Sequence, residues 1–166
     1  MTNTVLNMRT DIEHPETGID DTKLIAMNVS ACLADSYILM VKTQAYHWNA
    51  VGPLFHSVHE LTEKQYENLF SAIDVLAERV RALGYPAPSS ITDMISLSAI
   101  DEDMGNPTTE EMVQNLVADH ETVARRFRES AERAEDGKDP VTADMLTERL
   151  AVHEKSSWML RALLTG

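Results

Sequence analysis

This 166-residue sequence predicts an all-α fold, a four-helix bundle with one long connection. Apolar residues recur at three- and four-residue steps along much of the chain, and no β-type alternation persists for more than a few residues. Glycine and proline interrupt this periodicity, leaving helical segments of roughly 25–30 residues. The second and third segments are separated by residues 85–107, whereas the other connections are short.

The composition is that of an ordinary globular protein. Hydrophobic residues make up 43% and charged residues 25% of the chain, which excludes disorder throughout. The net charge of -13 disfavours a nucleic-acid partner. The single cysteine excludes a disulfide framework and a cysteine-rich zinc site. We find no apolar run of the ~18 residues that a membrane span needs and no secretory signal. We therefore expect a cytoplasmic protein without membrane contact.

We divide the chain into an acidic N-terminal tail, residues 1–21, and a helical bundle, residues 22–166. The first helix is predicted from Thr22 to about Asn49. The second runs from about Pro53 to Leu83, where glycine and proline follow and cannot continue a helix. The long connection has a short helical pattern at residues 91–98.

The last two helices carry recognisable start signals. Thr108 and Glu111 have the spacing of a capping box, so the third long helix begins there. Gly137 ends it. Asp139 is expected to cap the fourth helix, with Pro140 at its first position.

The second predicted helix carries metal-ligating side chains on one face. At 100° per residue and with His59 at zero, Glu63 falls near 40°, Asp74 near 60° and Glu78 near 100°. The apolar stripe of this helix lies at roughly 260–320°. A solvated polar face is the alternative interpretation, but this second face holds only residue types that bind metals.

One helix cannot wrap these four side chains around a single ion. Glu63 and Asp74 stand about 16 Å apart along the axis, whereas metal–ligand distances are near 2 Å. The pairs His59/Glu63 and Asp74/Glu78 must therefore serve different sites. An antiparallel two-fold copy of the helix would bring one pair of each chain against the other pair, making two equivalent sites. An intrachain network of solvated acids could share this spacing.

The ligand types narrow the choice of metal. Imidazole and carboxylate without thiolate suit Fe(II), Zn(II) or Mn(II). Di-iron bundles with an intrachain site use Glu-x-x-His pairs. No glutamate in this sequence is followed by histidine three positions later, so a site between subunits is the better candidate.

Two segments carry a family resemblance. Residues 47–63, HWNAVGPLFHSVHELTE, resemble the first signature of the Dps family, the DNA-binding proteins from starved cells. Residues 73–84, IDVLAERVRALG, resemble the second. Two positions depart from the family pattern: Ala50 replaces a larger aliphatic residue, and Glu63 replaces an aspartate.

The resemblance implies a ferritin-like four-helix bundle and a ferroxidase. Family members are hollow dodecamers, built from two-fold dimers, that oxidise Fe(II), preferably with hydrogen peroxide, and store the Fe(III) mineral inside. His47, His59 and Glu63 would come from one subunit, and Asp74 and Glu78 from its two-fold partner. Each site would take one or two irons, with Glu63 holding the second iron or orienting a bound water.

The resemblance also suggests roles for residues outside these segments. Trp48 and Trp158 would lie near the iron and intercept stray radicals; packing in the core or at an interface is the alternative. Asp139 and Asp144 would line the pore through which iron enters; helix capping or solvation is the alternative.

Three histidines and the cysteine have no assigned role in iron binding, iron entry or radical trapping. His56, His120 and His153 have no recognisable partners, so we expect ordinary packing or surface positions. Cys32 lies among apolar residues and should be a buried thiol.

DNA binding is predicted to be weak or absent. The N-terminal tail is net acidic, and Arg161 is the only basic residue after Trp158. Two other functions stay open: a DNA-packing protein of the same fold associated with the nucleoid, and a zinc-binding bundle without redox chemistry.

Overall fold

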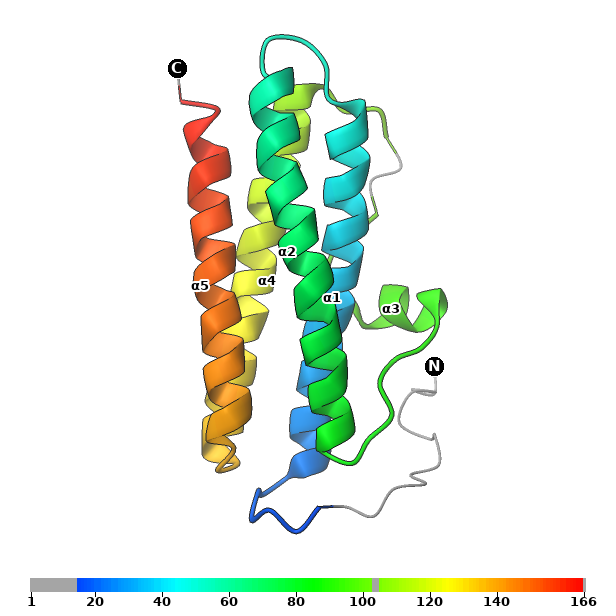
Figure 1. The fold of residues 1–166 in the computed structure, drawn as a ribbon, viewed down its shortest axis with the longest axis vertical. Coiled ribbons are helices and arrows are strands. Elements are labelled where there is room, and N and C mark those ends of the chain that lie inside the picture. The colour runs from blue at the N-terminus through cyan, green and yellow to red at the C-terminus, as the bar shows by residue number, and fades with distance from the viewer. Residues whose placement is uncertain (1–14, 103–104, 166) are drawn as a thin grey trace.

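The computed structural model describes residues 15–102 and 105–165, and within these residues it contains five helices and no strand. They are α1 (Thr22–Asn49), α2 (Phe55–Ala82), α3 (Ile91–Leu97), α4 (Thr109–Asp136) and α5 (Pro140–Ala162). The predicted all-α bundle is confirmed, with the short helix in the long connection (Figure 1).

The order of the helices explains the long connection. α1 and α2 form an antiparallel hairpin, and so do α4 and α5 (Figure 1). Because α2 and α4 run in the same direction, the chain between them must travel the length of the bundle, and α3 lies beside α1 on this path. The short turn between α1 and α2 brings His47, near the end of α1, beside His59, near the start of α2.

Local sequence signals explain most of the helix boundaries. The Thr108 side chain accepts from the backbone N–H of Glu111, and the Glu111 carboxylate accepts from the N–H of Thr108, which is the predicted capping box. Asp139 caps α5 by accepting from the N–H of Thr142 at 3.0 Å, and Pro140 occupies the first turn. Gly84, with φ of 91°, ends the second helix as expected.

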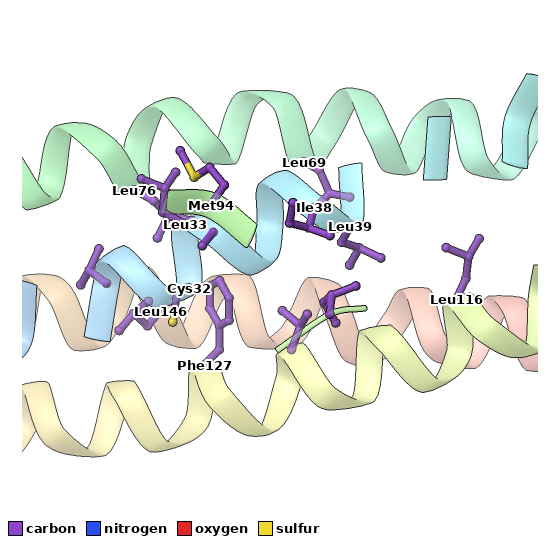
Figure 2. Packing of buried hydrophobic residues seen from close by; sticks show 14 of the residues in the cluster. Cys32, Leu33, Ile38, Leu39, Leu69, Leu76, Met94, Leu116, Phe127 and Leu146 are labelled. Atoms are coloured by element: carbon purple, nitrogen blue, oxygen red, sulfur yellow. The ribbon is translucent and has the colours of Figure 1, made fainter. Parts of the chain in front are cut away.

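The bundle interior is packed with apolar side chains from all five helices. The predicted stripe of α2 contributes Val58, Leu69 and Leu76, each at most 2% exposed. Phe127 of α4 and Met94 of α3 reach the same cluster (Figure 2). Cross-helix packing of this kind supplies most of the stability of an amphipathic bundle.

Helix α1 is more apolar than we expected. It contains an 18-residue window with mean hydropathy 1.7, long and apolar enough to cross a membrane by length and composition alone. Our expectation that no such run exists was wrong. In the bundle, 61% of that window is buried, as in a helix that contributes to a core.

A buried carboxylate anchors the long connection. Asp35 of α1 is 0% exposed and accepts hydrogen bonds from Ser98 Oγ at 2.9 Å and from the Ala99 N–H at 2.7 Å. Arg126 of α4 donates to the same carboxylate at 3.1 Å and to the carbonyl of Leu97 at 2.9 Å. This network fixes the segment after α3 to α1 and α4.

Most of the predicted N-terminal tail, residues 1–14, lies outside the described residues, so the division into tail and bundle stays a prediction. The tail's last residues contact the turn between α4 and α5. The N–H of Asp20 donates to the carbonyl of Gly137 at 2.8 Å, and the Asp20 carboxylate pairs with Lys138. Gly137 is buried in this contact.

Candidate metal centre

Two of the predicted site residues meet at the hairpin between α1 and α2. His47 lies near the end of α1 and is 7% exposed; His59 lies in the second turn of α2. Their rings stack with centroids 3.8 Å apart and an interplanar angle of 16°. His47 Nδ1 lies 3.0 Å from the carbonyl oxygen of His59, and His59 Nδ1 lies 3.1 Å from the carbonyl oxygen of His47.

These reciprocal hydrogen bonds determine the tautomer of both rings. A carbonyl oxygen only accepts, so each Nδ1 carries a proton and donates. In the neutral form each Nε2 then keeps a lone pair that can bind a metal. A hydrogen bond from the second ring nitrogen is the usual way in which a protein orients a metal-binding histidine. The hairpin therefore presents two pre-oriented imidazole ligands.

The loop that joins these histidines is held from α4. The Thr109 hydroxyl donates to the carbonyl of Val51 at 2.7 Å and accepts from the Val51 N–H at 2.9 Å. Gly52 has φ of 86°, a conformation that favours glycine, and its carbonyl accepts from the N–H of Phe55 at 3.0 Å. The first turn of α4 thus helps to position both imidazoles.

Two aromatic neighbours of the histidines were missed by the sequence analysis. The ring of Phe55 lies 5.1 Å from that of His59, and the ring of Tyr66 lies edge-on to that of His47 at 5.3 Å. Partial burial and the carboxylates of Glu63 and Glu67 raise the pKa of Tyr66. Tyr66 follows His59 by seven residues, two helical turns, and this spacing was a usable signal.

The predicted acidic pair lies toward the other end of α2. Asp74 and Glu78 are exposed on the surface. Glu78 lines an open groove of about 1020 Å³ between α2 and α5, together with Glu135, Asp144 and Glu148. The groove gathers four carboxylates and only one cationic side chain, that of Arg79. It is therefore a surface that attracts cations.

One chain does not bring the two ends of α2 together. Among residues 15–102 and 105–165, no three His, Cys, Asp or Glu side chains lie close enough to hold a metal ion. His47 and His59 lie together at one end of α2, with Glu63 one turn further along, and Asp74 and Glu78 occupy the other half. The two groups of predicted ligands therefore lie apart within one chain, and their use as two half-sites completed by a partner subunit stays a prediction.

The structure favours a different role for Asp139 from the predicted pore. Its side chain is 0% exposed, and both carboxylate oxygens lie 2.7 Å from Nη2 of Arg79. Thr142 donates to it as well. Burial raises the pKa of Asp139, but the bonds from Arg79 and Thr142 outweigh that effect and hold the pKa below its ordinary value. Asp139 is the buried helix cap of the alternative interpretation, whereas Asp144 is exposed in the acidic groove.

The remaining residues singled out in the sequence differ in their exposure to solvent. Trp48 and Trp158 are 65% and 66% exposed, so packing in the core of the chain is wrong for both, and the interface and radical-trap interpretations stay open. Cys32 is fully buried beside Ser130, and burial raises its pKa to about 12, so it is an inert thiol. His56 is exposed.

The chain was compared with known proteins. The ferritin-like domain family matches residues 29–166. A low temperature-induced protein of Nostoc sp. strain PCC 7120 is 46% identical over 136 residues, which cover 81% of this chain and 76% of that protein. The DNA protection during starvation protein 2 of Bacillus anthracis is 33% identical over 132 residues, covering 80% of this chain and 90% of that protein.

Solved structures agree with this result. A Dps protein from Bacillus brevis superposes with a TM-score of 0.83 at 33% identity, covering 86% of this chain and 96% of that one. A Dps protein from Vibrio cholerae O1, described as a member of a broad superfamily of ferritin-like diiron-carboxylate proteins, gives 0.86 at 26% identity, covering 93% and 98%.

Proposed function

Because this chain belongs to the Dps family of ferritin-like proteins, we propose that it oxidises Fe(II) with hydrogen peroxide at sites shared between two-fold-related subunits. The observation that carries the proposal is the stacked, reciprocally bonded pair His47/His59, at one end of a helix that carries Asp74 and Glu78 towards its other end. Each chain then contributes the imidazole half of one site and the carboxylate half of another.

The anionic and the neutral ligands have different roles in the proposed site. Asp74 and Glu78 supply anionic oxygens that hold iron through its change in oxidation state, and the neutral imidazoles complete the site without adding charge. Glu63 is one turn from His59 and holds a second Fe(II) or orients a bound water. Two Fe(II) ions each give up one electron, hydrogen peroxide accepts both electrons and two protons, and two water molecules form without release of hydroxyl radical.

The acidic groove is suited to deliver Fe(II), the substrate, to the carboxylate half-site. Asp144 and Glu148 lie in the same groove as Glu78, so cations drawn to α5 arrive beside the carboxylate half-site. In the proposed assembly, twelve chains of 18.6 kDa form a cage of about 220 kDa that stores the Fe(III) product.

Stopped-flow measurement of Fe(III) absorbance tests the proposal. Fe(II) is added anaerobically to the metal-free assembly, and peroxide starts the reaction. We expect Glu78→Ala and His47→Ala to lower the initial rate at least about tenfold, since losing a ligand weakens iron binding. His56→Ala, a change at an exposed histidine, is the matched control and should keep the wild-type rate.

The outcomes separate the competing functions. Native mass of each variant first shows that the assembly has formed. Equal rates in all variants would remove the site assignment. A wild-type rate equal to that of Fe(II) and peroxide in buffer would instead favour a zinc-binding bundle without redox chemistry.

DNA packing is a second function to test, because relatives are named for DNA protection. The charge of -13 per chain argues against it at physiological salt. A gel-shift assay at ~150 mM salt without divalent cations should leave the DNA band unshifted. A retarded band would overturn this expectation.

A further inference from the structure

Two buried histidines that are not among the proposed iron ligands form a pair inside the bundle. His120 of α4 is 1% exposed and His153 of α5 is 0% exposed, and their Nδ1 atoms lie 3.0 Å apart. Burial lowers the pKa of His120 to about 3 and lowers that of His153 well below its ordinary value. Both rings are therefore neutral near pH 7.

The contact between the rings limits what they can bind. In a neutral pair, one Nδ1 carries a proton and donates a hydrogen bond to the other Nδ1, which is unprotonated. The donating ring then has a bare Nε2, and the accepting ring has a protonated Nε2. Both Nε2 atoms are buried without a hydrogen-bond partner. The pair thus offers one acceptor and one donor rather than two lone pairs for a metal.

Both histidines line a pocket of about 320 Å³ between α2, α4 and α5, which we call the inner chamber. It opens to the surface beside the exposed side chains of Lys64, Asn68 and Lys155. Gln65, 7% exposed, lines it with both amide atoms unpartnered. Arg149 lines it with Nε and Nη2 unpartnered, while its Nη1 donates to Asn68 at 2.7 Å. Buried polar groups without partners are uncommon, and these residues give the chamber a lining whose hydrogen-bonding capacity is not satisfied within the chain.

The positive charge of the side chains that line the inner chamber favours an anionic ligand. The charged members of the lining are Lys64, Arg149 and Lys155, and none of the described residues that line it is acidic. This is unusual in a chain of net charge -13. A cation is disfavoured in such a chamber, whereas an arginine whose Nε and Nη2 have no hydrogen-bond partner is suited to an oxyanion.

The hydrogen-bond inventory points to an oxyanion that carries a proton. The unpartnered donors are the Arg149 N–H groups, the Gln65 amide N–H groups and one histidine Nε2–H. The unpartnered acceptors are the Gln65 carbonyl oxygen and the other histidine Nε2. We propose that the inner chamber binds inorganic phosphate, whose oxygens accept from these donors and whose P–OH group donates to one of the acceptors.

The inner chamber uses none of the side chains assigned to iron. His120, His153 and Arg149 are none of the residues assigned to iron. Gln65 follows Glu63 by two positions on α2, but it is buried in the bundle. The inner chamber lies within one chain, so it does not require a partner subunit.

Equilibrium dialysis of the metal-free, full-length assembly against radiolabelled inorganic phosphate tests the proposal. We expect saturable binding of about one phosphate per chain. Arg149→Met and Gln65→Leu should each weaken it at least about tenfold, because each removes hydrogen bonds to a charged ligand. Arg133→Met, at an exposed arginine of α4, is the matched control and should bind as the wild type does.

Two results would overturn the proposal. The first is no saturable uptake by the wild type up to about 10 mM phosphate, which would mean that ordered water fills the chamber. The second is equal binding by the wild type and the Gln65→Leu variant. Native mass confirms assembly of each variant, and Gln65→Leu decides the question if Arg149→Met does not assemble.

Discussion

Acidification from pH 7 to pH 5 should destabilise the chain through His120. The unfolded-state pKa of histidine is about 6.5, whereas burial lowers that of folded His120 to about 3. Between these two values the unfolded chain binds a proton that the folded chain does not. The free energy of unfolding therefore falls as the pH falls through this window, by about 1.4 kcal/mol per pH unit well below 6.5.

Integrated from pH 7 to pH 5, the loss is about 2 kcal/mol for His120 alone. Urea unfolding followed by tryptophan fluorescence, at one chain concentration, measures it in the wild type and in His120→Gln. Other titrating groups are common to both proteins, so the difference between their pH dependences reports the loss of His120 together with any change at its partner His153. His56→Gln, at an exposed histidine, should keep the wild-type dependence. If His120→Gln loses as much stability as the wild type over this range, the neutral buried pair is refuted.

Two substitutions test the packing around α5. Arg79→Met should lower the free energy of unfolding by about 3 kcal/mol, because it leaves the Asp139 carboxylate buried without its cation. Thermal unfolding measures this loss. Arg81→Met, at an exposed arginine of the same helix, is the control and should show no comparable loss. Gly137→Ala should cost about 1–3 kcal/mol, because the new Cβ would lie 2.7 Å from Cδ1 of Ile25 and 2.9 Å from a backbone carbonyl oxygen. A stabilised Gly137→Ala variant in urea unfolding would mean that this contact is looser than described.

The helix boundaries were predictable because their causes are local. Thr108 and Glu111 satisfy each other's backbone groups within one turn, and Asp139 does so for α5. The ends of α2 follow from glycine and proline near them. Such signals need no knowledge of the tertiary fold, and the long connection followed once the helices were counted.

What the sequence could not show depends on contacts between distant residues. Arg79 meets Asp139 across 60 positions, and this pairing of the buried helix cap with an arginine of α2 has no local signal. His120 meets His153 across 33 positions, and no spacing rule connects them. Core packing was one interpretation of Trp158, because helical periodicity does not distinguish a core face from a face left on the surface of the single chain.

The part of the candidate site that lies on one helix was predictable, because helix geometry is local. The order of His59, Glu63, Asp74 and Glu78 along one helix could be worked out from helix geometry. The reciprocal bonds between His47 and His59 could not, because they need the hairpin to close.

Mixing two damaged chains tests the shared site most directly. His59→Ala and Glu78→Ala chains are each expected to oxidise Fe(II) slowly as homo-assemblies. When they are dissociated and reassembled together, a mixed dimer combines the intact imidazole half of one chain with the intact carboxylate half of the other. Random pairing should then restore about a quarter of the wild-type sites, and of the rate. A mixture no faster than its separate components would show that each site lies within one chain, and would contradict the account.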